Sequence, residues 1–245
     1  MRKQNLFLAA ALFVGVLASC DTSDNEVTSF RTTPGKHVTE ENVEYYIPSP
    51  ADTVINNYSY VDLGLPSGSL WATKNIGATT VSDLGYTYRW GETNYYDRSN
   101  WVPYKYEDNY RYTKYNSTDG KLILDSEDDA AFINCGTGCH IPSVDDFHEL
   151  NLYCTWMYAI GSSGNSDFML GYLVTSRING KMIFLPENEY WINTLSSEDH
   201  GKAVNIYLDE DDYELSSGSR DGGMCAVRAV YKKNFKYGEA YDSGK

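Results

Sequence analysis

The sequence has few cations for its length. It contains 20 Lys and Arg against 34 Asp and Glu in 245 residues, so its formal net charge is −14. Binding to nucleic acid or to an anionic membrane surface requires clustered cations, and this composition argues against both. The hydrophobic fraction of 42% is typical of globular proteins, which excludes wholesale disorder. The length suits one or two domains.

The chain also lacks an apolar run long enough to cross a bilayer. The run from Leu6 to Ala18 has 13 residues, whereas a membrane-spanning helix needs about 20. Arg2 and Lys3 precede this run, and small residues follow it. Residues 1–19 therefore predict a cleaved secretory signal.

Catalytic and metal-binding motifs are scarce. There is no G-x-S-x-G nucleophile motif, no Gly-rich turn that opens a phosphate-binding helix, and no D-x-D-x-D-G calcium loop. Cys135, Cys139, His140 and His148 do not form the two separated ligand pairs common in zinc sites. We therefore expect no catalytic residues, no metal and no cofactor. A calcium site at Asp209–Asp212 stays open, although a solvated turn is the preferred interpretation.

The residues before Cys20 carry a specific signature. Leu17-Ala18-Ser19-Cys20 resembles the lipobox of bacterial lipoproteins. The resemblance implies that the chain is cut before Cys20 and that the thiol of Cys20 is acylated, which would make outer-membrane lipid a partner. The acidic residues after it, Asp21, Asp24 and Glu26, resemble the surface-export signal of Bacteroidota-type lipoproteins. We expect an outer-membrane lipoprotein exposed at the cell surface.

Composition divides the remaining chain into three parts. Residues 20–57 are polar and contain Pro34, Pro48 and Pro50, so they predict a tether. Residues 58–231 are long enough for one sizeable core, and residues 232–245 predict a polar tail. Asp52-Thr53-Val54 resembles a bacterial O-glycosylation tripeptide, which makes Thr53 a candidate glycosylation site.

Short strands and two helices can be read within 58–231. Alternating or apolar segments predict strands at 60–63, 85–90, 171–175, 182–185, 203–208, 212–215 and 224–230. Asn179-Gly180 predicts a hairpin turn. Capping-box spacing predicts helices after Ser126 and Ser143, the second with an apolar face that reaches Cys154 and Met157. Helices followed by a run of antiparallel strands indicate an α+β class.

Six ordered motifs resemble the Fibrobacter succinogenes major paralogous domain family. They are YVDLGLPSGSLWATKNIGA (60–78), YRWGE (88–92), EDDAA (127–131), HIPSVDDFHEL (140–150), NGKMIFLP (179–186) with Tyr190-Trp191, and AVRAV (226–230). The resemblance implies a C-type-lectin-like domain with two helices and a twisted, mostly antiparallel sheet, related to the formylglycine-generating-enzyme group. Two departures stand out, because Cys139-His140 replaces the usual Trp-Arg and Cys225 lies in the closing strand.

Tyrosine is the most unevenly distributed residue. The chain has 22 Tyr against 8 Phe, and many of them crowd into residues 86–115. Tyr combines a large contact area with a polar tip, which suits binding surfaces, although core packing is the alternative for each ring. The candidate ligand-binding residues are Tyr95, Tyr96, Trp101, Tyr104, Tyr106, Tyr110, Tyr190 and Trp191.

The cysteines leave alternatives open. Cys135 and Cys139 flank a short Gly-Thr-Gly loop, so they could form a disulfide or remain free. Cys154 lies on the predicted apolar helix face and is expected to be a buried free thiol.

These observations favour a surface-anchored lipoprotein with a non-enzymatic recognition domain for a glycan or a protein. A structural or assembly subunit of a cell-surface complex is one alternative. A degenerate formylglycine-generating-type enzyme that uses Cys225 is the other.

Overall fold

A computed structural model describes residues 35–40, 43–165 and 167–237 of the chain. The predicted signal, the lipobox with Cys20 and the acidic residues after it lie outside the described residues. The α+β class is confirmed, because most of the described elements are strands and two α-helices accompany them.

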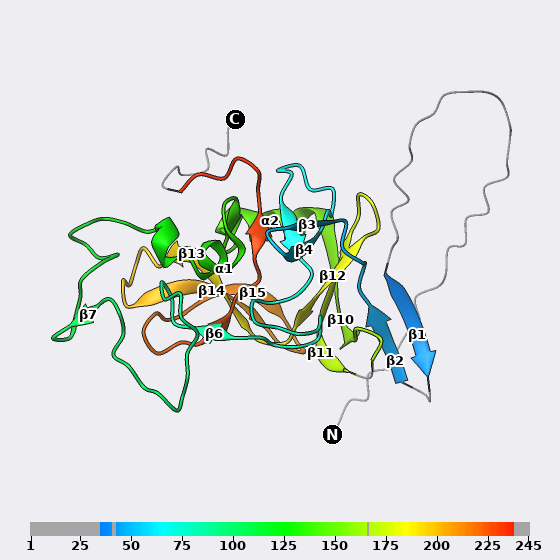
Figure 1. Ribbon diagram of the computed structural model, residues 1–245, viewed down its shortest axis with the longest axis horizontal. Helices are drawn as coiled ribbons and strands as arrows, with labels where there is room; N and C mark the ends of the chain where they lie inside the picture. The colour runs from blue at the N-terminus through cyan, green and yellow to red at the C-terminus, as the bar shows by residue number, and fades with distance from the viewer. Residues whose placement is uncertain (1–34, 41–42, 166, 238–245) are drawn as a thin grey trace, which may run out of the picture. The chain divides into compact units, whose positions relative to one another are not determined.

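Three five-stranded sheets and one small hairpin form the described part (Figure 1). Sheet A contains, in spatial order, β1 (Lys36–Glu40), β2 (Val43–Ile47), β10 (Cys154–Gly161), β11 (Met169–Ser176) and β12 (Met182–Pro186). Sheet B contains β3 (Thr53–Ile55), β4 (Tyr58–Val61), β5 (Leu70–Ala72), β17 (Val230–Tyr231) and β9 (Cys139–His140). Sheet C contains β15 (Tyr213–Ser219), β14 (Lys202–Leu208), β13 (Glu189–Leu195), β16 (Cys225–Ala226) and β6 (Thr87–Tyr88). The hairpin pairs β7 (Glu107–Asp108) with β8 (Arg111–Tyr112).

Most strand pairs are antiparallel, as predicted. Among the described residues, only β2 with β10 and β13 with β16 pair in parallel. The hairpin at Asn179-Gly180 is confirmed: β11 pairs with β12, and Gly180 has a φ of 73°, which the turn requires. The strand predicted at 85–90 is shorter than expected, since only β6 is paired.

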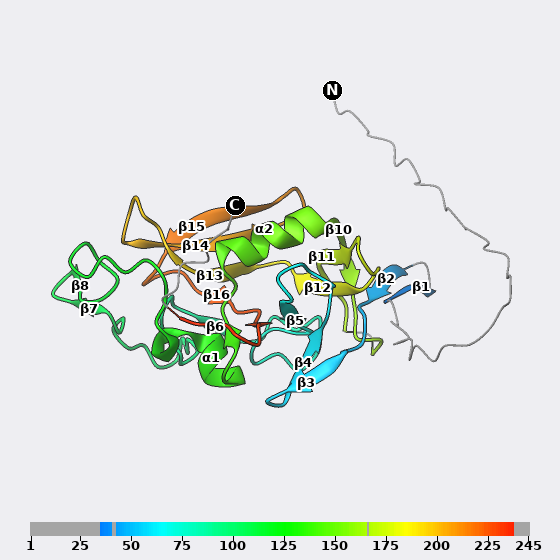
Figure 2. The same cartoon turned by 90° about the horizontal axis from the view of Figure 1, so that it is seen from above.

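Helix α2 (Val144–Tyr153) begins where the sequence predicts and ends earlier. The Ser143 side chain accepts a hydrogen bond from the Asp146 amide at 3.1 Å, and the Asp146 carboxylate accepts one from the Ser143 amide at 2.9 Å. The predicted extension of the helix to Met157 is wrong. Cys154 begins β10 instead, because its ladder with β11 satisfies the backbone along the whole strand. Figure 2 shows α2 lying between β10 and β14 in that view.

Helix α1 (Ala130–Cys135) is capped by Asp129 and not by Ser126. The Asp129 carboxylate accepts hydrogen bonds from the amides of Ala131 and Phe132. It also accepts from the Ile141 amide, which ties the helix to the strand that follows. Ser126 instead begins a short 3₁₀ turn, η1 (Ser126–Asp128), that has no side-chain cap.

The boundaries predicted for the tether and the tail are wrong. Strands β1, β2 and β3 all fall within residues 20–57, and Thr53 is half-buried in β3. Tyr45 of β2 is buried and packs edge-on against Phe168. These residues fold because strands at the edges of sheets A and B offer them backbone hydrogen-bond partners. Such partners cannot be predicted from the polar composition of the segment.

The start of the predicted tail also packs on the domain. The Lys232 amide donates to the Gly138 carbonyl at 2.9 Å, and the Phe235 ring stacks on His140 at 3.7 Å between centroids. The Tyr237 hydroxyl donates to the Cys139 carbonyl at 3.1 Å. Residues 232–237 thus cover β9.

The strand predicted at 224–230 is split into β16 and β17, which belong to different sheets. Between them, the carbonyls of Val227 and Ala229 accept hydrogen bonds from the amides of Ile76 and Ala72. Two hydrophobic cores lie on either side of this closing segment: one contains Trp90 and Val227, the other Trp71 and Val230. None of the described helices is long and apolar enough to cross a membrane.

Candidate functional site

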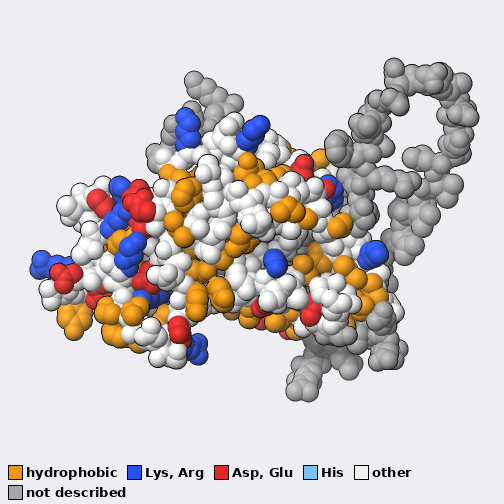
Figure 3. Space-filling view, in the orientation of Figure 1, with side chains coloured by type: hydrophobic (Ala, Val, Ile, Leu, Met, Phe, Trp, Pro, Cys, Tyr) orange, Lys and Arg blue, Asp and Glu red, His pale blue; other side chains and the backbone are white. Residues whose placement is uncertain are grey.

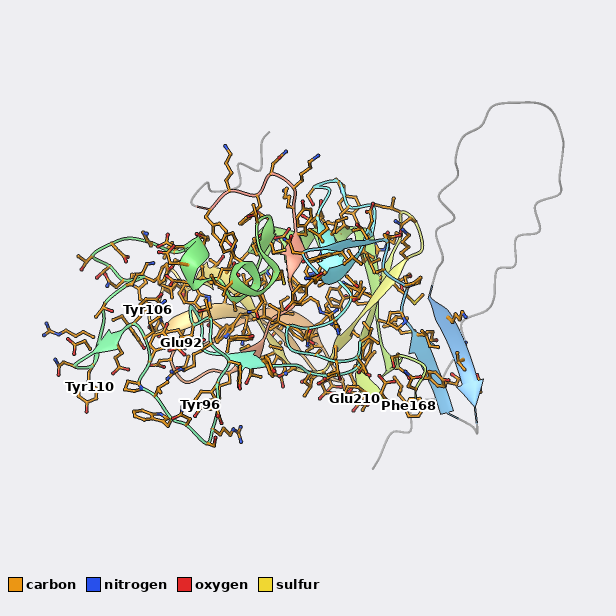
Figure 4. All side chains as sticks on the ribbon, viewed as in Figure 1. Glu92, Tyr96, Tyr106, Tyr110, Phe168 and Glu210 are labelled. Carbon is orange, nitrogen blue, oxygen red and sulfur yellow. The ribbon has the colours of Figure 1, made fainter. Side chains whose placement is uncertain are left out.

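The predicted ligand-binding aromatics divide into two groups. Tyr95, Trp101 and Tyr110 are exposed, and Tyr96 is half-buried. The prediction is wrong for the other four, because Tyr104, Tyr106, Tyr190 and Trp191 are buried. Figure 4 shows Tyr106 lying inward of Tyr96 and Tyr110.

The four buried rings serve the core. Trp191 donates its indole N–H to the Tyr88 carbonyl at 2.6 Å, and the Tyr190 hydroxyl donates to the Pro186 carbonyl at 2.7 Å. Tyr104 donates to the Trp90 carbonyl at 2.7 Å. These three rings bury their apolar bodies and satisfy their polar tips internally. The fourth ring, Tyr106, packs edge-on against Tyr104 and Tyr115, so none of the four presents a ring face to a ligand.

Tyr86 lies just before β6, and Tyr95, the half-buried Tyr96 and Trp101 lie in the loop after it; we call these four rings the aromatic platform. Tyr86 and Tyr95 stack with centroids 4.3 Å apart and planes inclined by 22°. The Tyr86 ring rests on Gly77, where a Cβ would come within 2.3 Å of Cδ2. Tyr86 is thus held from below while Tyr95 remains 52% exposed and Trp101 70% exposed. Figure 3 shows hydrophobic side chains gathered in this region, at the lower left of the view.

Arg89 fixes the loop that carries the platform. Its buried guanidinium pairs with Glu92 at 2.9 Å and donates to the Val102 carbonyl at 3.0 Å. It also lies 5.8 Å from the centre of the Tyr96 ring. Glu92 in turn accepts from the Lys105 amide at 2.8 Å. One buried ion pair therefore positions both ends of the segment between Tyr96 and Val102.

Tyr110 does not belong to the platform. It lies at the tip of the β7–β8 hairpin, where it is 96% exposed and has a φ of 62°. In Figure 4 the hairpin tip with Tyr110 projects away from Tyr96. Tyr110 is an isolated ring and provides a natural control for the platform.

Cys135 and Cys139 are free thiols in this structure, and both are buried. The Cys139 sulfur lies 3.0 Å from the Tyr60 hydroxyl and 3.5 Å from the Cys135 carbonyl. A hydrogen bond from the Cys135 thiol lowers the pKa of Cys139, although burial opposes this shift. Cys154 is a buried free thiol as predicted, and burial raises its pKa to about 12.

Cys225, the residue that an oxidase would need, is unsuited to attack. Its thiol is buried, and burial together with the Glu189 carboxylate raises its pKa. The Asn205 side chain is its neighbour at 4.0 Å. A thiol that stays protonated is a poor nucleophile.

A groove of about 800 Å³ lies between α2 and residues 232–236, with His140 and Asp146 in its wall. His140 Nε2 lies 3.1 Å from the Asp146 carboxylate. Burial would raise the pKa of Asp146, but hydrogen bonds from His140 and Ser143 lower it to about 2. The Ser143 hydroxyl donates to Asp146 and not to His140. The pair therefore orients a buried ring and activates no serine.

Carboxylate clusters among the described residues also have structural explanations. Asp125, Glu127 and Asp128 converge, but Lys114 Nζ lies 2.6, 3.2 and 2.5 Å from them and takes the place of a cation. At the Asp209–Asp212 tip, the Asp209 carboxylate accepts from the amides of Asp211 and Asp212. This geometry is that of a solvated turn.

Two residues of the site, Tyr86 and Arg89, do not stand out in the sequence as site residues. Tyr86 was assigned to a half-buried strand, and Arg89 had no predicted role. The alternation Tyr86-Thr87-Tyr88-Arg89 places Tyr86 and Tyr88 on one strand face, but only Tyr88 is buried. The signal for Arg89 was the Arg-Trp-Gly-Glu spacing, which allows a pair between residues three apart at the end of the strand.

No protein-family model, curated protein or solved structure matches this chain. The geometry described above therefore carries the functional argument.

Proposed function

We propose that the chain is a lipoprotein displayed on the bacterial surface and that its folded part recognises a glycan or a protein without catalysing a reaction. The lipobox and the acidic residues after Cys20 support the location. The aromatic platform supports the recognition role. The observation that carries the proposal is Trp101, a large ring 70% exposed on a loop that a buried ion pair holds in place.

An exposed and fixed ring has physical significance for binding. Large apolar side chains left in water represent unrealised burial energy, of about 25 cal/mol per Å² of apolar area. A loop already fixed by Arg89 loses little conformational freedom when a ligand binds, so more of that energy contributes to affinity. Tyr and Trp carry such contacts with few rotatable bonds.

We also propose the C-type-lectin-like fold for the described part. Two helices with mostly antiparallel sheets support it, as does the position of the motifs, since HIPSVDDFHEL starts at the end of β9 and covers most of α2. The AVRAV motif spans the crossing from β16 to β17. An experimental structure of this chain with a strand order unlike that of C-type lectins would contradict the assignment.

The binding role can be tested on glycan and protein arrays with the full-length lipoprotein in detergent. We expect Trp101→Ala and Tyr95→Ala to lower the array signal at least tenfold, because each removes an exposed contact ring. Tyr110→Ala should keep the wild-type signal, since Tyr110 lies outside the platform. Absence of wild-type binding on both arrays would contradict the recognition role.

The location is tested separately on intact cells. External protease should digest the described part of the wild-type protein, and Cys20→Ser should release the chain from the membrane fraction. Survival of the protein on intact but not on lysed cells would show that it faces inward.

A further inference from the structure

We infer that the platform takes a neutral polysaccharide and binds it by stacking sugar rings on its aromatic faces, without a metal ion. This inference rests on the proposed recognition function and narrows its ligand to one chemical class. Three features of the described residues support it: the orientation of the rings, the chemistry of the side chains between them, and the charge around them.

The rings present faces that suit a flat ligand. Tyr86 is supported by Gly77 on one side and by Tyr95 on the other. Tyr95 therefore completes the stack, and more than half of its surface remains exposed. The axial C–H groups of a pyranose form an apolar patch the size of an aromatic ring. Such a patch stacks on Tyr and Trp faces, while the hydroxyl groups at the sugar's edge remain available for hydrogen bonds.

Polar groups lie between the rings in sequence. Asn94 and Asn100 are exposed on either side of the Tyr95–Ser99 segment. Each amide offers both donors and acceptors, the combination that a sugar hydroxyl can satisfy. The segment itself is held by Asp97, whose carboxylate accepts from the Ser99 amide at 2.8 Å. A protein interface of stable size has an apolar centre that excludes water, which this alternation of single rings and amides does not provide.

The charge on and around the platform favours a neutral ligand. Arg89, a buried cation next to the platform, is neutralised by Glu92 and also donates to the Val102 and Pro103 carbonyls. Its guanidinium is buried and presents no edge at the surface for a sulfate or a carboxylate. The exposed neighbours Asp97 and Arg98 in the same loop carry one charge of each sign, so the loop itself adds no net charge. The chain as a whole carries a net charge of −14, which repels polyanions. Uronate-rich and sulfated chains are therefore disfavoured.

The test measures binding of the immobilised full-length lipoprotein by biolayer interferometry. The neutral probes are amylopectin, a mixed-linkage β-glucan and a galactomannan, and the anionic probe is polygalacturonate. We expect at least one neutral probe to bind and polygalacturonate not to bind. Trp101→Ala should weaken the neutral interaction at least tenfold, whereas Tyr110→Ala and the addition of EDTA should leave it unchanged.

The outcomes separate this inference from the proposed function. Binding to proteins on the array with no neutral probe bound overturns the inference and leaves the recognition role standing. Binding of polygalacturonate alone, or loss of the neutral interaction in EDTA, also overturns the inference. A protein that binds no glycan and no protein contradicts both. Native thermal melting curves for both Ala variants, compared with wild type, establish that the two substitutions leave the fold intact.

Discussion

At the scale of single residues, the described part of this acidic protein buries the guanidinium groups of Arg89, Arg220 and Arg228, and Arg89 is paired with Glu92. Neither Arg220 nor Arg228 forms an ion pair with a described residue. Arg228 donates to Asn75 and to the carbonyls of Ala72 and Phe184 at 2.8–2.9 Å. Burial lowers its pKa to about 10, because the charged form loses its hydration. Both arginines therefore depend on neutral oxygen atoms for compensation.

Arg220 has an additional aromatic enclosure. Its guanidinium carbon lies 4.6–5.8 Å from the centres of four rings: Trp90, Tyr104, Tyr112 and Tyr115. It donates to the Tyr104 hydroxyl and to the carbonyls of Lys114, Tyr115 and His200. Much of the tyrosine-rich segment is thus organised around one internal cation.

We expect Arg220→Met to destabilise the fold by about 3 kcal/mol, because it leaves several buried carbonyl groups without donors. Urea unfolding monitored by tryptophan fluorescence measures this change. Arg111→Met is the control: Arg111 is exposed on β8, and its replacement should change stability by less than about 0.5 kcal/mol. Equal stability of the two variants would show that the enclosure contributes nothing.

The lowered pKa values of two buried carboxylates, Asp128 and Asp146, predict that the fold loses stability in acid. Burial would raise the pKa of Asp128, but hydrogen bonds from Lys105 and Lys114 lower it to about 2, and the pKa of Asp146 is also about 2. Both values lie below the ordinary 3.8, so each group stabilises the fold above pH 4 and loses this contribution as the pH falls towards 2. The contribution is about 2 kcal/mol for each group.

Urea unfolding at pH 7, 4 and 2.5 measures this effect. We expect Asp146→Asn to be less stable than wild type at pH 7 and to show a smaller decrease in stability between pH 4 and 2.5. A wild-type stability that stays constant over this range would contradict the lowered pKa values.

At the scale of elements, the same serine–acid spacing occurs before both α-helices but forms a capping box at only one of them. Ser143 and Ser126 are each followed by an acid three residues later, but only Ser143 caps a helix. We expect Ser143→Ala to cost about 1 kcal/mol of stability, because the Asp146 amide loses its side-chain acceptor and the Asp146 carboxylate loses a hydroxyl donor. Ser126→Ala should cost less than about 0.5 kcal/mol, and a larger loss for Ser126 than for Ser143 would reverse this assignment.

Some boundaries of helices and strands can be predicted from the sequence, and others cannot. The start of α2 and the Asn179-Gly180 turn depend on residues within a few positions, so the local pattern was sufficient. The end of α2 depends on the pairing of β10 with β11, and the folding of β2 depends on an edge more than 100 residues away. A short stretch of sequence does not show whether its residues will continue a helix or pair with a distant strand.

The exposure of the rings at the candidate site also depends on residues far away in the sequence. Tyr95 and Tyr104 both belong to the tyrosine-rich segment, but one is exposed and the other is buried. The difference arises from Arg220, which meets the Tyr104 hydroxyl at 2.9 Å from 116 positions further along the chain. The sequence could therefore predict the aromatic segment as a candidate but could not predict which rings face the solvent.

At the scale of the whole molecule, the last strands complete two sheets. Strand β16 lies between β13 and β6 in sheet C, and β17 lies between β5 and β9 in sheet B. We expect a chain that ends at Gly223 to lose cooperative thermal unfolding, because β6 and β9 would each lose a strand partner. A chain that ends at Tyr237 keeps all of the described strands and should retain a single transition. A cooperative transition in the shorter chain would show that the sheets form without their closing strands.

This arrangement has a consequence for biogenesis. Because β16 and β17 follow all of their strand partners in the sequence, a nascent chain cannot complete sheets B and C until residues 225–231 have been synthesised. A polypeptide that follows the proposed export route must pass through a translocon before it folds. The position of the closing strands would delay folding until residues 225–231 have emerged, and it would therefore help to keep an exported precursor unfolded.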